Sequence, residues 1–216
     1  MKLSRLLKNI LKNSIPQSLL LQKGNKESKK IALTFDDGPF PEKTDNILDI
    51  LRRHDIKATF FMIGSAIESN KDLFRKIIDE GHEIGNHFYN HRSVSGRSYE
   101  ELDMEVSTWE KVVKDIAPLY DYPRLLRFPY GRSDLKSFCY AWRNNWRIVH
   151  WSVDSRDLDP ISVDVIIETL KSGPISGGDI ILLHDDSMHA EVLLEWIIRE
   201  GLKSGYIFSR ISELKT

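Results

Sequence analysis

The sequence predicts an α/β fold with a largely parallel sheet that closes, or nearly closes, into a barrel. From residue 31 onward, short apolar runs alternate with amphipathic helical stretches, which is the pattern of repeated strand–helix units. Several of the apolar runs are almost continuously hydrophobic, as expected for strands that are covered on both faces. The number of units favours a barrel or near-barrel over an open sheet, and 216 residues suit one such domain.

The expected elements follow one another without an internal repeat or a low-complexity tract. Strands are expected at residues 31–35, 57–64, 82–88, 124–131, 147–154, 178–186 and 206–211. Helices are expected at residues 44–55, 70–82, 98–116, 134–146, 163–173 and 190–205. Local signals set some of the helix ends, since Ser98 and Glu101 form a capping box and Gly81 closes the second helix.

The charge and the cysteine content exclude several classes of protein. The chain has 31 basic and 32 acidic residues, so it offers no general basic surface and no nucleic-acid partner is expected. Cys139 is the only cysteine, which rules out an intramolecular disulfide and a zinc site built from cysteines. We expect Cys139 to be a small apolar side chain within a helix.

Residues 1–30 are expected to form a basic amphipathic helix and a polar linker, and residues 31–216 the main domain. The first stretch lacks the unbroken apolar core of a signal peptide because Lys8 and Lys12 interrupt it, and no other stretch is long enough to span a bilayer. Two interpretations stay open, in which the helix packs on the domain or lies on an anionic membrane surface. Both imply a cytoplasmic location, the second with peripheral contact at the inner face of the membrane.

Polar residues follow the predicted strands at their C-terminal ends, which form the rim where α/β barrels build active sites. They are Asp36 and Asp37, His87 and His91, Arg127 and Tyr130, Asp154 and Asp157, and His184 and Asp185. The first two are adjacent carboxylates at the end of a buried strand, where they repel each other and need partners. They belong either to a turn, since Asp-Gly and Gly-Pro are turn dipeptides, or to a site in which one acid holds a metal and the other handles a proton.

His87 and His91 are candidate metal ligands because two histidines separated by three residues can face one metal ion from a helix or a tight loop. Gly85 and Asn90 favour a loop here. One carboxylate of the aspartate pair would complete the two-histidine, one-carboxylate set that is common in catalytic zinc sites. His82 is expected to be structural instead, holding the loop by a hydrogen bond.

The remaining carboxylate of the pair could act as a base, with Arg127 as the neighbouring cation that orients it. His184 suits a general acid because histidine titrates near neutral pH, and Asp157 could hold its imidazole. The structural alternatives are loop capping and a surface ion pair with Arg156 for the aspartates at 154 and 157, and a salt bridge between loops for Arg127.

Five ordered stretches, TFDDGP, NHFYNH, RFPYG, WSVDSRDL and ILLHD, resemble the motifs of the polysaccharide deacetylases, the NodB-homology domain of carbohydrate esterase family four. The resemblance runs from about Ile31 almost to the C-terminus. It implies a distorted, incomplete α/β barrel. It also implies hydrolysis of an N-acetyl, or less often an O-acetyl, group on a sugar.

The resemblance assigns a role to each matching position. Asp36 would be the general base that Arg127 orients, and His184 the general acid that Asp157 supports. The backbone N–H of Tyr130 would share the oxyanion with the metal. The divalent metal, usually zinc, would be bound by Asp37, His87 and His91. The substrate pocket would include Leu183, Leu158 and Pro129.

Two positions depart from the family pattern. Phe88 stands where the family usually has a serine or threonine whose hydroxyl steadies the metal-binding loop, so metal affinity is expected to differ. Leu158 stands where the family usually has a tryptophan that lines the acetyl and sugar pocket, so the substrate is expected to be larger or different. Neither departure removes a metal ligand, the base or the acid.

The function expected from the sequence is removal of N-acetyl groups from an acetylated amino sugar in a glycan or a glycan precursor by a metal-dependent hydrolase. A cytoplasmic location would favour a lipid-linked or nucleotide-linked precursor. Two alternatives stay open. One is a hydrolase of a non-sugar amide on the same scaffold, and the other is a catalytically silent domain that binds a metal or a glycan.

Overall fold

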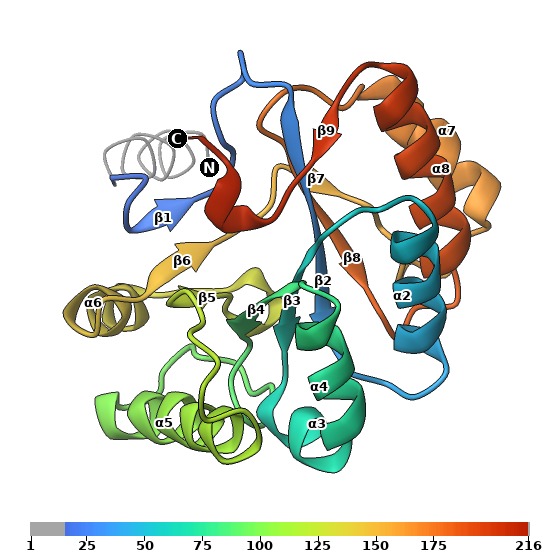
Figure 1. The fold of residues 1–216 in the computed structure, drawn as a ribbon. Helices are drawn as coiled ribbons and strands as arrows, with labels where there is room; N and C mark the ends of the chain where they lie inside the picture. The colour runs from blue at the N-terminus through green and yellow to red at the C-terminus, as the bar shows by residue number, and fades with distance from the viewer. Residues whose placement is uncertain (1–15, 216) are drawn as a thin grey trace.

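The computed structural model describes residues 16–215 and contains one curved parallel sheet with helices around its outer side (Figure 1). The strands lie in the order β1-β6-β5-β4-β3-β2-β8-β7, and β9 pairs with β2. Their bounds are Leu20–Leu21 for β1, Lys30–Asp37 for β2, Thr59–Met62 for β3, Glu83–Asn86 for β4, Leu125–Leu126 for β5, Arg147–Val149 for β6, Val153–Asp154 for β7, Ile180–His184 for β8 and Ile207–Phe208 for β9. Within the described residues the terminal strands β1 and β7 do not pair, so the barrel is open and the predicted incomplete α/β barrel is confirmed.

Seven helices of the described chain cover this sheet, with α2, α7 and α8 on one side of Figure 1 and α3, α4 and α5 below. Their bounds are Lys43–Arg53 for α2, Gly64–Ser69 for α3, Lys71–Asp79 for α4, Tyr99–Ile116 for α5, Leu135–Arg143 for α6, Val163–Ser172 for α7 and Ala190–Lys203 for α8. Two short 3-10 helices, η1 and η2, span Pro129–Gly131 and Ile211–Glu213. The predicted capping box of α5 is present, because Ser98 and Glu101 bond each other's backbone N–H groups.

Strand β2 shows how the fold creates a polar position inside the barrel. Alternate residues of a strand point to opposite faces of the sheet. Leu33 and Phe35 pack under the helices, and Phe35 stacks on Phe60 at 4.9 Å between ring centroids. Ala32 belongs to the second apolar cluster, inside the barrel. The same alternation turns Asp36 into the barrel, where it is buried.

Some sequence-based expectations need correction. The expected strand at 147–154 is two strands, β6 and β7, and α3 was not expected at all. Cys139 lies in a helix, α6, as expected, and its side chain is exposed. The structural role of His82 is confirmed, since its Nδ1 accepts a hydrogen bond of 3.1 Å from the Ala58 N–H. Burial lowers the pKa of His82 to about 3.

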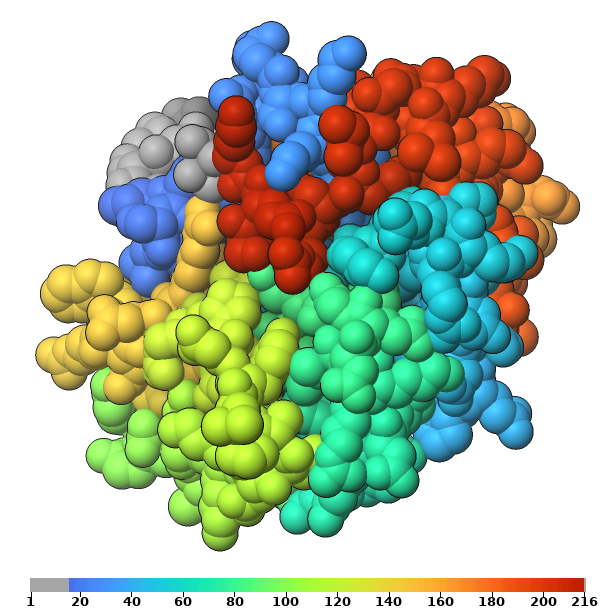
Figure 2. All heavy atoms as spheres, viewed as in Figure 1, coloured from blue at the N-terminus to red at the C-terminus, as the bar shows by residue number. Residues whose placement is uncertain are grey.

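The N-terminal part of the described chain is joined to the domain. β1 pairs with β6, so residues 20–21 add a strand to the sheet although the expected domain began at residue 31. The expected linker that follows is also held, because the Asn25 N–H donates to the Lys215 carbonyl at 2.8 Å. Figure 2 shows these N-terminal and C-terminal segments side by side. The expected amphipathic helix falls within residues 1–15, outside the described residues. None of the helices between residues 16 and 215 has the length and hydropathy that crossing a membrane requires.

Candidate active site

The predicted site residues converge at the C-terminal ends of the strands. The register of the parallel sheet places Asp36, on β2, opposite His184, on β8. The loop after β4 supplies His87 and His91, and the segment after β5 supplies Arg127. The structure therefore brings together residues that are up to 148 positions apart in the sequence, as the barrel rim requires.

Asp37, His87 and His91 form a group whose ligand atoms all lie within 4.8 Å of one another. Oδ1 of Asp37 is 3.4 Å from Nε2 of His87 and 3.1 Å from Nε2 of His91. Ligands at tetrahedral positions around zinc are about 3.3 Å apart, given metal–ligand distances of ~2.0–2.2 Å. The three atoms are therefore spaced as the ligands of one metal ion would be.

Two further observations fit a metal ion rather than an internal hydrogen-bond network. Nδ1 of His87 lies 2.8 Å from the Arg127 carbonyl oxygen, so this nitrogen carries the proton and leaves the Nε2 lone pair free. Oδ1 of Asp37 is buried and accepts no hydrogen bond. A buried carboxylate oxygen without a donor is costly, and a cation would satisfy it.

The backbone of the site is held in the left-handed region at several residues that are not glycine. Asp37, Phe88, His91 and Tyr130 have φ values of 82°, 65°, 52° and 61°. This conformation is unfavourable for L-residues and persists only where the surroundings enforce it. At Asp37 it ends β2 and gives the two adjacent carboxylates different directions, so that Asp36 points inward and Asp37 faces the histidines.

Asp36 is paired with a fully buried arginine. Nη1 of Arg127 donates to Oδ1 of Asp36 at 2.6 Å and to Oγ1 of Thr34 at 2.9 Å. Nε of Arg127 donates to the Val149 carbonyl at 3.2 Å, and its guanidinium lies 4.0 Å from the centre of the Phe61 ring. Burial lowers the pKa of Arg127 although Asp36 acts to raise it. The guanidinium is fixed from several sides, and it fixes the carboxylate of Asp36 in turn.

His184 and Asp157 form the second pair. Nδ1 of His184 lies 2.9 Å from Oδ1 of Asp157, and the His184 backbone N–H donates to Oδ2 at 2.7 Å. Burial acts to lower the pKa of His184, but the bond to Asp157 and the charges of the nearby aspartates outweigh it and raise this pKa to about 9. His184 is thus protonated near neutral pH, with Nε2 free to donate. The alternative of a surface ion pair for Asp157 is wrong, since the residue is buried.

Asp154, in contrast, has a structural role in the loop. It is exposed, and its Oδ1 accepts a hydrogen bond of 2.9 Å from the Arg156 N–H. The ion pair of Arg156 is with Asp159. Asp154 therefore caps the loop, which is one of the two structural alternatives considered for it.

Asp185 is one of the residues expected at the rim, and no function was expected for it. It is buried, and its Oδ2 accepts a hydrogen bond of 2.6 Å from Oγ1 of Thr44. Burial raises the pKa of Asp185 to about 8. A Cβ at Gly38 would lie 1.7 Å from Oδ2 of Asp185, so only glycine fits beside this carboxyl group. Thr34 was not among the expected site residues either, although strand alternation puts it on the same face of β2 as Asp36.

The expected pocket residues differ in their surroundings. Leu183 is fully buried in the apolar cluster under the helices, because alternation along β8 turns it away from the face of His184. The structure therefore does not bring Leu183 to the surface of the site. Pro129 is buried at the start of η1. Leu158 is exposed, and so is Tyr130, whose ring centre lies 4.6 Å from that of His91.

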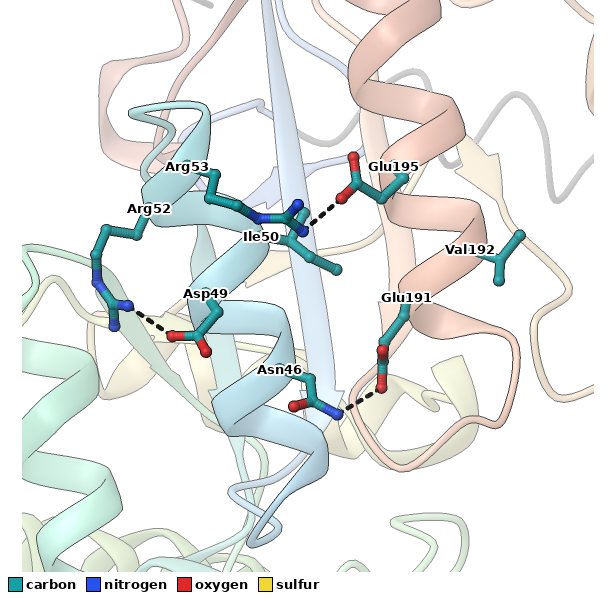
Figure 3. Close-up of a pocket in the computed structure, with 8 residues that line it drawn as sticks. All are labelled: Asn46, Asp49, Ile50, Arg52, Arg53, Glu191, Val192 and Glu195. Carbon is teal, nitrogen blue, oxygen red and sulfur yellow. Dashed lines mark hydrogen bonds and ion pairs between the residues drawn. The ribbon is translucent and has the colours of Figure 1, made fainter.

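A groove between α2 and α8 lies apart from these residues (Figure 3). Two pairs of its polar side chains cross between the helices, with Arg53 bonded to Glu195 at 2.6 Å and Asn46 to Glu191 at 2.8 Å. Arg52 bonds Asp49 within α2. None of its lining residues belongs to the predicted site. We interpret it as the ordinary surface between two packed helices.

Comparison with known proteins agrees with the geometry. The sequence model of a family described as polysaccharide deacetylase matches residues 23–145. A peptidoglycan-N-acetylglucosamine deacetylase of Bacillus cereus is 39% identical over 195 residues, which cover 86% of this chain and 88% of that protein. A protein of the same description from Listeria monocytogenes is 31% identical over 99% of this chain, and the chain spans only 45% of the length of that relative.

Solved structures resemble the fold closely. A chitin deacetylase from the fungal pathogen Colletotrichum lindemuthianum superposes with a TM-score of 0.83 at 26% identity, over 93% of each chain. A protein from Bacillus anthracis described as a pseudoenzyme of carbohydrate esterase family four superposes with the same score at 25% identity, over 94% of this chain and 70% of that chain. The scaffold is thus seen both in a protein described as a deacetylase and in one described as a pseudoenzyme.

Proposed function

Because this chain belongs to the polysaccharide deacetylase family, we propose that it is a metal-dependent hydrolase that removes N-acetyl groups from an acetylated amino sugar in a glycan or a glycan precursor. The observation that carries the proposal is that the adjacent carboxylates of Asp36 and Asp37 have different partners. One carboxylate is bonded to Arg127 and the other faces two histidines. Relatives described as acting on peptidoglycan N-acetylglucosamine and on chitooligosaccharide support the substrate class.

Asp37, His87 and His91 would hold the metal ion. Two imidazole nitrogens and one carboxylate oxygen are a typical ligand set for catalytic zinc, so zinc is the ion we propose. The chemistry that such an ion supplies is Lewis acidity, which polarises an acyl carbonyl and lowers the pKa of water. The bond from His87 to the Arg127 carbonyl would keep the imidazole in the tautomer that can bind it.

Asp36 would act as the general base. Its carboxylate accepts the proton of the attacking water as the oxygen bonds to the amide carbon. The bond of 2.6 Å from Arg127 holds Oδ1 of Asp36 and leaves Oδ2, which lies 3.9 Å from Nε2 of His87, facing the ligand group. The base would therefore stand beside the place where the water is activated.

His184 would act as the general acid on the other side of the site. Its Nε2 proton passes to the amide nitrogen as the carbon–nitrogen bond breaks, so that the products are acetate and the free amine. Asp157 keeps the imidazole oriented and protonated. The Tyr130 backbone N–H would donate to the carbonyl oxygen as negative charge develops there.

The second candidate is a silent domain that binds a metal or a glycan, which the pseudoenzyme among the structural neighbours favours. The complete set of ligands, base and acid in this chain argues for the enzyme. A third candidate, hydrolysis of a non-sugar amide, rests on Leu158, which follows Asp157 in the sequence and has an exposed side chain.

Acetate release separates these candidates. We would incubate the full chain with an N-acetylated glucosamine oligomer, first with a chelator and then with zinc restored. Release that stops with the chelator and returns with zinc is the expected result. Stoichiometric zinc binding without release from the oligomer, but with hydrolysis of a non-sugar amide, would support the third candidate. Binding without hydrolysis of either substrate would support the silent domain.

A further inference from the structure

A buried glutamate stands out on the apolar face of α5. Glu105 lies in helical register with the buried residues Leu102, Val106 and Trp109, and 7% of its surface is exposed. A buried carboxylate is costly unless donors surround it. Glu105 lies among core residues, so we expect hydrogen-bond donors around its carboxylate.

Glu105 holds the loop between the two histidine ligands. Its Oε2 accepts hydrogen bonds from the backbone N–H groups of Tyr89 at 3.1 Å and of Asn90 at 2.8 Å. Its Oε1 accepts a third, of 3.2 Å, from the side-chain amide of Asn90. All three donors lie between His87 and His91.

The loop needs this support because its backbone is unfavourable at two places. Phe88 and His91 both have positive φ values, of 65° and 52°, which are uncommon for residues other than glycine and most of all for a bulky residue such as Phe88. The Phe88 N–H is bonded by Oδ1 of Asn86 at 2.8 Å. The next two N–H groups point to Glu105, so two side chains account for three successive amides of the loop.

We propose that Glu105 is a positioning residue for the metal site, which fixes the loop so that His91 meets Asp37. The position at 88 cannot share this task, because Phe88 has no polar atom in its side chain and is buried against Phe128. The inference rests on the proposed function only in taking Asp37, His87 and His91 as metal ligands. Glu105 touches none of the three and acts through the backbone between two of them.

The test is zinc affinity of the full chain, measured by competition with a chromophoric chelator. Outer partners of metal ligands typically contribute 10–100-fold to affinity, so Glu105→Ala is expected to weaken zinc binding by about that factor. Glu105→Gln keeps one carbonyl oxygen for the two backbone donors but presents an amide N–H₂ to Asn90, so an intermediate loss is expected. Asp115→Ala is the matched control, because it removes one carboxylate from the exposed side of the same helix and should leave affinity unchanged.

A general loss of structure is separated from positioning by a double-mutant cycle. If Glu105 acts through His91, Glu105→Gln should weaken binding by a smaller factor in the His91→Ala background than in the unaltered chain. Should Glu105→Ala fail to fold, Glu105→Gln carries the test alone. Folded variants of Glu105 with unaltered zinc affinity would overturn the inference and leave the proposed metal site intact. Absence of zinc binding in the unaltered chain would overturn both.

Discussion

Nη1 of Arg127 lies 2.6 Å from Oδ1 of Asp36, and both side chains are buried at the C-terminal end of β2. The pair explains how two adjacent aspartates coexist at one site. Arg127 neutralises the first, and the second turns away through a backbone with φ of 82° to face two histidines. The ionic partner of each carboxylate sets its chemistry, so that one can accept a proton and the other can bind a cation.

Arg127→Ala is expected to destabilise the fold strongly. Removing one member of a buried ion pair leaves an uncompensated charge and costs about 3–5 kcal/mol. Urea denaturation of the variant would measure this loss. Arg156→Ala is the control, since its ion pair is exposed and such pairs contribute about 0–1 kcal/mol. Equal denaturation midpoints for the two variants would show that the Asp36–Arg127 pair contributes no more than a surface contact.

Asp157→Asn is expected to change the pH dependence of acetate release. A general acid must be protonated, so activity should fall as pH rises through the pKa of His184, which Asp157 helps to raise to about 9. Without the negative charge of Asp157, this pKa falls toward its ordinary value of ~6.5. The basic limb of the rate profile should therefore move to lower pH, whereas Asp154→Asn should leave it in place. An unmoved limb in Asp157→Asn would mean that another group supplies the proton.

Gly38→Ala is expected to destabilise the chain because the new methyl group would meet the Asp185 carboxyl at 1.7 Å. Overpacking of this kind costs about 1–3 kcal/mol. If the clash is the cause, adding Asp185→Ala should recover part of the loss, which denaturation of the single and double variants would reveal. Gly173→Ala is the matched control, since a Cβ there meets nothing within 4 Å. Strictly additive effects would place the strain elsewhere.

The fold was predictable because its signals are local. Alternating apolar runs and amphipathic stretches, and the capping box of Ser98 and Glu101, depend on residues close together in the sequence. The prediction of strand bounds was weakest at residues 147–154, where one apolar run contains two short strands, β6 and β7. Tertiary pairing alone ends β6 at Val149 and begins β7 at Val153.

The residues of the candidate site could be predicted from the sequence, but not all of the residues that hold them in place. Asp36, Asp37 and the histidines follow strand ends, and parallel strands bring such ends together. Glu105 carries a weaker signal, a charged residue on the apolar face of α5. Gly38 and Asp185, which lie close together, are 147 residues apart in the sequence, and no sequence pattern predicts their contact. Leu183 was misplaced because it directly precedes His184, and adjacent residues of a strand such as β8 point to opposite faces of the sheet.

The substitution Asp36→Asn tests the central claim most directly, because it removes a proton acceptor and keeps the shape of the side chain. Zinc content and acetate release would be measured on the same preparation, with Asp37→Asn prepared in parallel. The proposed roles of the two carboxylates predict that Asp36→Asn retains stoichiometric zinc while acetate release falls by about 10²–10⁴-fold, and that Asp37→Asn loses zinc. Full activity of Asp36→Asn, or loss of its zinc, would contradict the separate roles assigned to these two neighbouring carboxylates.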